Sequence, residues 1–277
     1  MTLAIGFFDG VHLGHRRILA GADAVLTFRN HPLSVIRPSA APQLLMPADE
    51  RIELLRTAGA KVPRTVHAVR FTGKFAAMRP EEFAAYLHRE FPDLGKVHCG
   101  GNWRFGANGA GTPQTLRDFG FSVNVSRYAK CGDCVISSTR IRAALAEGDI
   151  DLANSMLGRH YSITGNVTSG KGVGSAMGTP TLNFEAVSPL RLGVYAVDTP
   201  CGRGVANYGV APTMGEKAWK APVLEVHLTD VPEDRPIPAR GPVKVEFLRF
   251  LRPERKFESR DSLCRQIAAD IAAAREA

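Results

Sequence analysis

Residues 3–15 read Leu-Ala-Ile-Gly-Phe-Phe-Asp-Gly-Val-His-Leu-Gly-His, and this stretch decides how the first half of the chain folds. The apolar run Leu3–Phe8 ends at Asp9-Gly10, which predicts a buried strand followed by a tight turn. We expect a short helix over Gly14–Leu19. A strand that leads through a glycine turn directly into a helix is typical of one unit of an α/β sheet.

Two histidines stand where the predicted helix begins. If the helix starts near His12, then His12 and His15 lie on one face of it. Gly14 between them lets a phosphate or a ring come close to the backbone, and a helix N-terminus attracts anions. A pair of imidazoles there could stabilise charge on a phosphoryl group. Elsewhere in proteins such a pair is more often a metal site or part of the core, so its position after the strand is the informative feature.

Strands and helices continue to alternate after this stretch. Further strands are predicted over Ala24–Phe28, Thr65–Phe71, Lys96–Cys99 and Phe121–Val125. Helices are predicted over Asp49–Arg56, with Asp49 as N-cap, and over Pro80–Arg89, which has proline and acidic residues in its first turn. The alternation predicts a parallel α/β sheet.

The second half of the chain has a different pattern. Two helices, Ser138–Glu147 and Asp151–Leu157, precede short β-rich runs separated by Gly and Pro, and a helix over Ser259–Arg275 closes the chain. The β-rich runs are Ile163–Val167, Gly193–Val197, Val205–Gly209, Leu224–Leu228 and Val243–Phe250. They predict a small antiparallel barrel. We therefore expect two domains, residues 1–157 and residues 158–277.

The composition excludes several classes of protein. The chain has 277 residues, 44% hydrophobic and 22% charged, which is typical of globular proteins and not of disordered or coiled-coil chains. The longest apolar runs fall short of the ~18 residues that a membrane-spanning helix needs. The first residues lack the basic start and apolar run of a signal peptide. We therefore expect a cytoplasmic protein without membrane contact.

The net charge of +8 has no concentrated source. Five of the excess positive charges fall in residues 1–155 and three in residues 156–277, and there is no basic run of five residues. A solvated basic surface explains this spread better than a nucleic-acid interface does, so we expect no nucleic-acid partner. Scattered cations facing small phosphorylated ligands are a third interpretation.

Five cysteines, an odd number at low density, fit a reducing compartment. Cys131-Gly-Asp-Cys134 has the spacing of a metal knuckle, but a zinc site needs about four ligands and the sequence has no second such pair. A metal or redox role for Cys131 and Cys134 is therefore the minor interpretation.

Two further motifs carry polar side chains at informative places. Ser137-Ser-Thr-Arg-Ile-Arg142 begins a helix, and Ser138 would serve as a plain N-cap. Arg140 and Arg142 oppose the helix dipole there, which an anionic ligand would explain. In Gly178-Thr-Pro-Thr-Leu-Asn183, Thr181 and Asn183 share one side of an extended segment, and their oxygens suit Mg²⁺. An ordinary β-turn is the alternative.

Together these motifs resemble the bacterial bifunctional riboflavin kinase/FAD synthetase family, over nearly the whole chain. The resemblance rests in the first half on residues 6–15, Thr27-Phe28, His31-Pro32, 101–106 (Gly-Asn-Trp-Arg-Phe-Gly) and 136–142, and at the junction on 157–161. In the second half it rests on Pro180–Asn183, Gly193–Tyr195, Val205–Gly209, Pro212-Thr213, Leu224–His227 and Arg252–Phe257.

For the first half, the resemblance implies a Rossmann-like nucleotidylyltransferase domain. Its activity would be that of an FMN adenylyltransferase, which joins FMN to the AMP part of ATP and releases pyrophosphate. His12 and His15 would stabilise the transition state. ATP would be bound by Gly6, Phe8, Asp9, Gly10, Ser138, Thr139 and Arg142. The flavin would be bound by Thr27, His31, Pro32, Asn102 and Phe105.

For the second half, the resemblance implies a six-stranded riboflavin kinase barrel with a terminal helix. Glu225 would accept the proton of the riboflavin 5′-hydroxyl, and Thr181 and Asn183 would hold Mg²⁺ with ATP. Gly170, Gly174 and Gly178 would form the ATP loop, and Arg252 would lie near the flavin. Both steps would use ATP, so the substrates would be ATP, riboflavin and FMN.

The chain departs from the family pattern in both halves. Only eight residues separate His15 from Ala24, where the family has a longer helix. In the kinase half, Ser175 and Ala211 stand where the family has Arg, Thr179 replaces Phe, and the usual segment after Glu225 is not recognisable in 230–241. Two alternatives therefore stay open. One is a monofunctional adenylyltransferase with a degenerate kinase barrel, and the other is a non-catalytic regulator that binds flavin or nucleic acid. The oligomeric state is not predicted.

Overall fold

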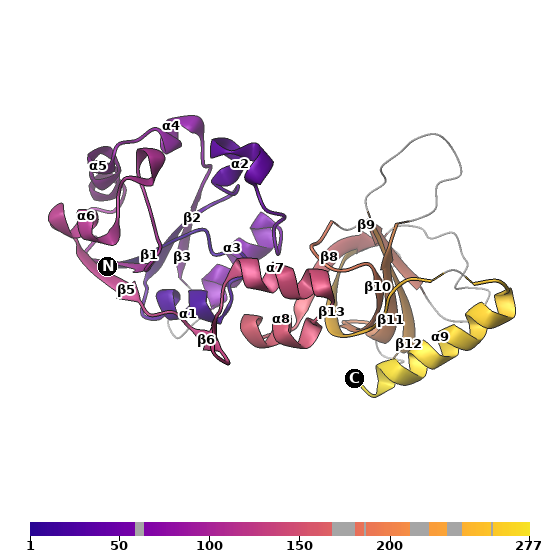
Figure 1. Cartoon of the computed structure of the whole chain (residues 1–277). Coiled ribbons are helices and arrows are strands. Elements are labelled where there is room, and N and C mark those ends of the chain that lie inside the picture. The colour runs from indigo at the N-terminus through magenta and orange to yellow at the C-terminus, as the bar shows by residue number, and fades with distance from the viewer. Residues whose placement is uncertain (59–63, 168–180, 186, 211–221, 232–239, 256) are drawn as a thin grey trace. The chain divides into compact units, whose positions relative to one another are not determined.

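The computed structural model describes residues 1–58, 64–167, 181–185, 187–210, 222–231, 240–255 and 257–277. Contacts divide the chain into two compact units, Met1–Ser138 and Thr139–Ala277. Each unit has a sheet of its own, parallel in the first and antiparallel in the second (Figure 1). The predicted domain boundary at 157/158 stays a prediction.

The first unit is built on a parallel sheet of five strands in the order β3-β2-β1-β4-β5. The strands are β1 (Thr2–Ile5), β2 (Ala24–Phe28), β3 (Thr65–Val69), β4 (Lys96–Gly100) and β5 (Ser122–Ser126). β1 ends at Ile5 and not at Phe8 as predicted, because Phe8 turns to φ 59° and leaves the extended region. The central position of β1 in a parallel sheet brings the turn after it to the carboxyl edge, where α/β proteins bind ligands.

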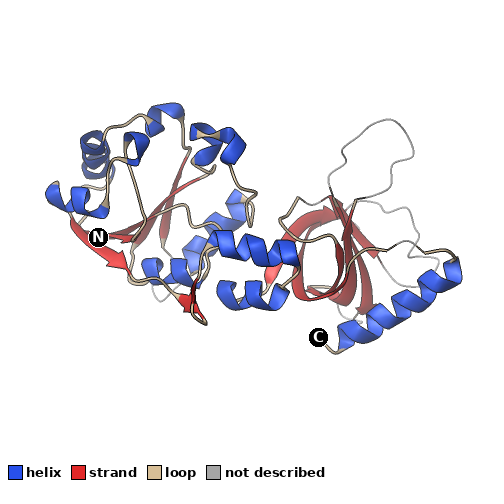
Figure 2. Cartoon of the chain, viewed as in Figure 1, coloured by secondary structure: helices blue, strands red, loops and turns tan. Residues whose placement is uncertain are grey.

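Helices lie on both faces of this sheet (Figure 2). They are α1 (Leu13–Leu19), α2 (Leu33–Ile36), α3 (Ala48–Thr57), α4 (Gly73–Ala76), α5 (Pro80–Glu90) and α6 (Pro113–Asp118), with 3-10 turns at Pro38–Ala40 and Ala107–Gly109 and a hairpin of β6 (Lys130–Cys131) and β7 (Cys134–Val135). Leu3 packs in one core cluster with Leu87 of α5, and Ala4 in another with Leu55 of α3. Successive residues of β1 therefore point to opposite, covered faces.

The predicted N-cap of α3 is wrong by two positions. Pro47 occupies the N-cap and Asp49 is the second residue of the helix. The aspartate still favours the helix start, because a carboxylate in the first turn interacts with the helix dipole. It also forms an exposed ion pair with Arg29 at 3.1 Å.

α7 (Ser138–Glu147) begins at the last residue of the first unit and continues in the second. The second unit also holds α8 (Ile150–Leu157) and an antiparallel sheet in the order β8-β13-β10-β11-β12-β9. The strands are β8 (Tyr161–Val167), β9 (Thr181–Glu185), β10 (Gly193–Thr199), β11 (Gly202–Gly209), β12 (Val223–Asp230) and β13 (Gly241–Arg252). The two edge strands meet: a Cβ on Gly165 of β8 would stand 2.7 Å from the Cβ of Phe184 in β9. The predicted six-stranded barrel is therefore confirmed as a nearly closed sheet. The alternation of apolar residues does not predict β9.

Side chains of the barrel strands alternate between its interior and its outer face. In β12, Leu224 and Val226 are buried, whereas the alternating residues Glu225 and His227 are partly exposed. The last helix, α9 (Arg260–Arg275), packs on the outer face through a cluster that includes Val205 and Ala274. The partly exposed side chains of β12 therefore lie on the same face that α9 covers further along the sheet.

Candidate active sites

The turn after β1 has an unusual backbone. Phe8, Gly10 and Val11 all have positive φ, at 59°, 79° and 40°. Val11 is β-branched, so this conformation costs free energy and persists only where the surrounding structure imposes it. Its N–H donates to the Phe8 carbonyl at 3.0 Å. Strained turns of this kind concentrate at functional sites.

Hydrogen bonds of Asp9 connect this turn to two segments that are distant in the sequence. Its buried carboxylate accepts hydrogen bonds from the Leu45 N–H at 3.0 and 3.3 Å. Its carbonyl accepts one from the Ser138 hydroxyl at 2.9 Å. Ser138 is the first residue of α7 and not its N-cap as predicted, and its hydroxyl connects the start of this helix to Asp9. The contact confirms that the two sequence motifs meet in space.

The two histidines are stacked. Their ring centroids are 3.5 Å apart with an interplanar angle of 17°, and His12 is buried. His12 is the N-cap of α1, where its Nδ1 accepts the His15 N–H at 3.2 Å. Since Nδ1 is an acceptor, neutral His12 carries its proton on Nε2. A Cβ on Gly14 would stand 3.0 Å from Cε1 of His12, so this close approach requires the glycine.

His15 lies in an apolar and cationic environment. Its ring makes an edge contact with Phe8 at a centroid distance of 5.3 Å. Burial lowers the pKa of His15 well below its usual 6.5, and the nearby His12 and Arg51 lower it further. His15 is therefore the neutral imidazole at pH 7, able to donate from one nitrogen and accept at the other.

Arg51 of α3 is a residue of this site that the sequence analysis missed. It is fully buried, its guanidinium lies 4.0 Å above the Phe7 ring, and Nη2 donates to the Phe28 carbonyl. Burial lowers its pKa to about 10, which Asp9 partly opposes, so it stays cationic at neutral pH. Its Nε and Nη1 have no hydrogen-bond partner among the described residues. The sequence contained one signal of this burial: Arg51 lies four residues before the buried Leu55, on the same face of α3.

A cavity of about 880 Å³ opens beside the turn and has a largely aromatic lining. Among its lining residues are Phe7, Phe28, Phe71, Phe75, Phe83, Trp103 and Phe105, with Pro32, Arg37 and Arg104. Trp103 and Phe105 are stacked at a centroid distance of 4.9 Å. The volume and the flat rings suit a planar aromatic ligand.

Of the five residues expected at the flavin, two line this cavity, Pro32 and Phe105. Thr27 is buried next to the cavity lining, and its hydroxyl donates to the Phe7 carbonyl at 3.1 Å. The His31 and Phe7 rings are in edge-to-face contact, with their centroids 4.6 Å apart. Both therefore position Phe7. Asn102 is exposed and is not part of the lining.

The remaining residues expected at the ATP phosphates are divided between the units. Gly6 lies so close to the Phe8 ring that a Cβ would stand 2.9 Å from it. Thr139 and Arg142 belong to the second unit, where Arg142 Nη2 donates to the Thr139 hydroxyl at 3.4 Å. Gly170, Gly174 and Gly178 lie outside the described residues, as do Ser175, Thr179 and Ala211.

The second candidate site is a polar row across three strands of the barrel. Register places Asn183 of β9 opposite Glu225 of β12, and Glu225 opposite Asn207 of β11. Thr181 is paired with His227 in the neighbouring row. Because alternate strand residues share a face, all five side chains belong to the outer face of the barrel.

Side chains of these rows contact one another and a neighbouring loop. His227 Nδ1 lies 3.2 Å from the Thr181 hydroxyl, and its Nε2 lies 4.0 Å from Oε1 of Glu225. Asn207 Nδ2 donates to Oε1 of Glu254 at 3.2 Å. The sequence analysis assigned no role to His227, Asn207 or Glu254, although period-two spacing from Glu225 was a usable signal for His227.

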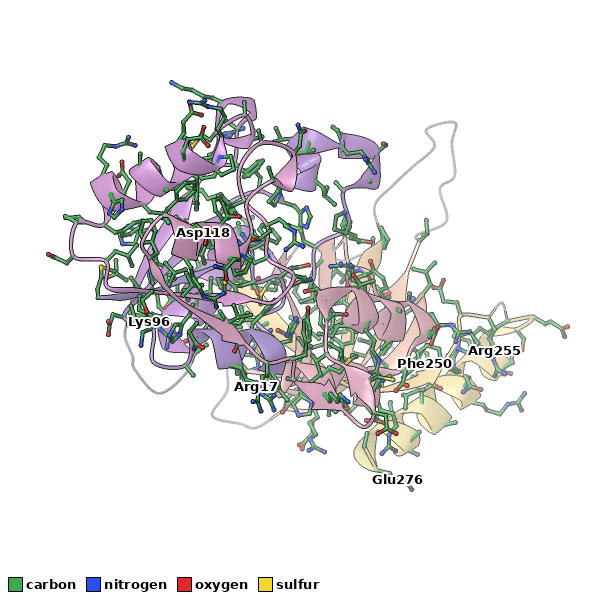
Figure 3. The ribbon with its side chains drawn as sticks, turned by 60° about the vertical axis from the view of Figure 1, so that its left-hand side comes forward. Arg17, Lys96, Asp118, Phe250, Arg255 and Glu276 are labelled. Carbon is green, nitrogen blue, oxygen red and sulfur yellow. The ribbon has the colours of Figure 1, made fainter. Side chains whose placement is uncertain are left out.

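Arg252 is held by the last helix. Its Nε and Nη2 donate to the Asp270 carboxylate at 2.9 and 2.7 Å, and Gln266 donates to the same carboxylate at 2.7 Å. Nearby, Arg255 lies 4.8 Å from the centre of the Phe257 ring and donates to Gln266. Figure 3 labels Arg255. The structure thus gives Arg252 a role in docking α9, and its predicted flavin contact stays a prediction.

Replacing Asp270 by Asn should destabilise the second unit by about 3 kcal/mol, because it leaves the largely buried Arg252 guanidinium without its counter-charge. Urea unfolding of the full chain measures this effect. The exposed Arg275→Gln change in the same helix is the control and should shift the midpoint little. An unchanged midpoint in D270N would show that the pair does not hold α9.

None of the described helices is both long and apolar enough to cross a membrane. Among the same residues, no three His, Cys, Asp or Glu side chains gather where they could hold a metal ion. The metal expected at Thr181 and Asn183 would instead be held by a hydroxyl and an amide oxygen.

Comparisons with known proteins match both halves of the chain. The FAD synthetase family model matches residues 1–140, and the riboflavin kinase model matches residues 157–277. The bifunctional riboflavin kinase/FMN adenylyltransferase of Bacillus subtilis is 33% identical, covering 97% of this chain and 90% of its own. That of Escherichia coli K12 is 35% identical, covering 99% and 92%. A crystal structure named as a macrolide-efflux protein from Streptococcus pneumoniae has a TM-score of 0.82 at 26% identity, covering 99% and 93%.

Proposed function

Because this chain belongs to the family of bifunctional riboflavin kinase/FMN adenylyltransferases, we propose that the His12–His15 turn and the Glu225 row are its two active sites. The chain makes FAD in two ATP-dependent steps: it phosphorylates riboflavin to FMN and then adenylylates FMN. The stacked histidines beside an aromatic cavity support the first assignment, and the connected row Thr181–His227–Glu225 supports the second.

In the adenylyltransferase unit, an oxygen of the FMN phosphate attacks the α-phosphorus of ATP, and the bond to the β-phosphate oxygen breaks. Negative charge grows on the oxygens around the α-phosphorus. His12 donates to them from Nε2, since its Nδ1 is occupied by the His15 N–H. Neutral His15 holds the His12 ring by stacking, and Arg51 adds positive potential from behind.

The aromatic cavity takes the isoalloxazine ring of FMN. Flat apolar rings on its walls, such as Phe75 and Trp103, offer stacking surfaces. Arg37 and Arg104 give the lining its positive charge, which suits a flavin that carries a phosphate. Since the cavity also reaches Gly6 and Phe7, the flavin phosphate can approach the turn that holds the histidines.

In the kinase unit, Glu225 accepts the proton of the riboflavin 5′-hydroxyl as the γ-phosphoryl group is transferred. The Thr181 hydroxyl and the Asn183 amide oxygen are hard donors on one face of β9, and this donor set fits Mg²⁺. The metal would neutralise charge on the ATP phosphates. His227 orients Thr181 through a hydrogen bond, and its other ring nitrogen lies 4.0 Å from the Glu225 carboxylate.

A product assay tests the proposal as a whole. Purified protein is given riboflavin, ATP and Mg²⁺, and flavins are separated by chromatography. We expect both FMN and FAD, and loss of both on chelation of the metal. FAD from FMN but nothing from riboflavin would identify a monofunctional adenylyltransferase with a degenerate barrel. Flavin or RNA binding without any product would identify a regulator.

Replacing Gly14 by Ala should lower the adenylyltransferase kcat about tenfold, because the new Cβ forces the His12 ring out of its position. Steady-state kinetics with FMN measure the change. The matched control is Gly95→Ala, whose Cβ would make an ordinary contact of 3.7 Å. Kinase activity should be unaffected in both variants. Full adenylyltransferase activity in G14A would contradict the stacked arrangement.

A further inference from the structure

The hairpin before α7 places two cysteines directly opposite each other. Cys131 of β6 is paired with Cys134 of β7, and Gly132-Asp133 form the two-residue turn between them. Gly132 has φ 57° at the first turn position, which is typical of a type II′ hairpin turn. The pairing is therefore set by the turn, and the two thiols project from the same face of the hairpin.

The register places these cysteines within reach of a disulfide. The Ile136 N–H donates to the Ala129 carbonyl at 2.9 Å, so by alternation the Cys131–Cys134 pair is also of the hydrogen-bonded type. Such pairs have Cα atoms about 5.5 Å apart, inside the range of about 4.4–6.8 Å that disulfides span. Cys134 is exposed and Cys131 is partly exposed, so a reagent in solution can reach the pair.

The other cysteines differ from this pair. Cys99 and Cys201 are buried, and burial raises the pKa of the Cys99 thiol to about 11. Cys264 is exposed on α9, at a distance of 130 residues along the chain and in the other unit. Within the described residues, no third ligand-type side chain joins Cys131 and Cys134 to make a metal site. The pair is thus better suited to thiol chemistry than to metal binding.

We propose that Cys131 and Cys134 are a reversible dithiol–disulfide site that takes low-molecular-weight disulfides as its oxidant. The thiolate of the exposed Cys134 attacks one sulfur of the oxidant, whose S–S bond breaks and releases one thiolate. The Cys131 thiolate then attacks the Cys134 sulfur, forming the internal bond and releasing the second thiolate. The protein loses two electrons and two protons, and the oxidant becomes two thiols.

The hairpin is connected to the histidine turn at both ends. The Tyr128 carbonyl accepts a hydrogen bond from Arg17 of α1 at 3.0 Å; Figure 3 labels this arginine. The Ile136 carbonyl would lie 3.6 Å from a Cβ on Gly14. Beyond the hairpin, the Ser138 hydroxyl donates to the Asp9 carbonyl. A change in the hairpin is therefore transmitted to α1 and to the turn.

Closing the disulfide changes the hairpin. In cross-strand pairs the two Cβ atoms are about 4.5–5.5 Å apart, and the hydrogen-bonded pairs have the longer distances in this range. A disulfide requires a Cβ–Cβ distance of about 3.5–4.5 Å. The strands must twist to close this gap, which moves Ile136 and the start of α7. We expect oxidation to raise the KM for ATP in adenylylation several-fold. This effect rests on the proposed adenylyltransferase site, whereas formation of the disulfide does not.

Formation of the disulfide is tested by treating the full chain with glutathione disulfide and alkylating the remaining thiols. The protein is then digested, and the peptide masses are measured by mass spectrometry. The expected result is an internal Cys131–Cys134 bond without a glutathione adduct, reversed by dithiothreitol, and a stable adduct on Cys131 in the Cys134→Ser variant. Cys264 is the internal comparison, as an exposed thiol outside the pair. Stable adducts on Cys131 or Cys134 of the unmodified sequence, at the level of Cys264, would overturn the proposal.

The coupling is tested by kinetics in a Cys264→Ser background, before and after oxidation. The KM for ATP should rise several-fold in adenylylation and recover with dithiothreitol, and it should stay constant when Cys131 and Cys134 are both replaced by Ser as well. Kinase activity of the same samples should not change. If the disulfide forms but this KM is unchanged, the proposed effect of oxidation on adenylylation is overturned. Failure of the reduced chain to make FAD from FMN would instead overturn the proposed function.

Discussion

His12→Asn should lower the kcat for FAD formation from FMN by at least about 100-fold, the usual effect of removing one donor to a developing oxyanion. The two ring nitrogens of His12 have different roles, which this substitution separates. Its Nδ1 caps α1 by accepting the His15 N–H. In the proposed mechanism, its Nε2 carries the proton that is donated to the phosphoryl group. Asparagine is a good N-cap, so it keeps the first contact and removes the second.

His12→Ala is the companion variant. It loses the cap as well, so its unfolding free energy should fall by about 1 kcal/mol relative to the asparagine variant, with a similar loss of activity. Each variant also has an internal control, because riboflavin phosphorylation by the second unit should continue at the original rate. Asparagine at position 12 with more than half of the original kcat would show that the Nε2 proton plays no part.

The position of the histidine site could be predicted from sequence because it follows from local order. A strand, a turn with Gly10 and a short helix in succession necessarily bring His12 and His15 to the edge of the sheet. The local pattern also fixes Gly14 between them. The local pattern does not predict the strained backbone at Val11. That conformation depends on the contacts of Asp9 with Leu45 and Ser138, which are distant in the sequence.

Arg51 could not be predicted for a related reason. A charged residue in an amphipathic helix is normally solvated, and only the packing of α3 against Phe7 and the end of β2 makes this one a buried cation. Its influence on the pKa of His15 is therefore a property of tertiary structure. The net charge of +8, spread evenly over the sequence, gave no indication that Arg51 and Arg64 are buried.

The kinase row shows the same limit across strands. Period-two spacing places Thr181 with Asn183 and Glu225 with His227, because each pair lies within one strand. The sequence does not give the register between strands, which brings Asn207 of β11 beside Glu225. Likewise, the contact of Arg252 with Asp270 depends on where α9 returns to the barrel. Local pattern therefore predicts the members of each strand, and only the long-range pairing assembles the site.

Glu225→Gln should abolish FMN formation from riboflavin, lowering kcat about 100- to 10,000-fold, while FAD formation from FMN continues. Glutamine has the shape of glutamate and keeps its backbone pairing with Asn183 and Asn207. It cannot accept the proton of the 5′-hydroxyl, so the loss reports proton transfer and not folding. A chain given riboflavin and ATP should then make neither FMN nor FAD, whereas one given FMN should make FAD normally.

Glu246→Gln on β13 is a close match for this test. Its side chain is 33% exposed against 35% for Glu225, and it also has a charged neighbour, Lys244, but it lies outside the polar row. We expect its kinase kcat to stay within about twofold of the original, as for an exposed ion pair of little energetic weight. Kinase activity that survives in E225Q would place the base elsewhere. Glu254 would be the next candidate, because Asn207 connects it to the same row.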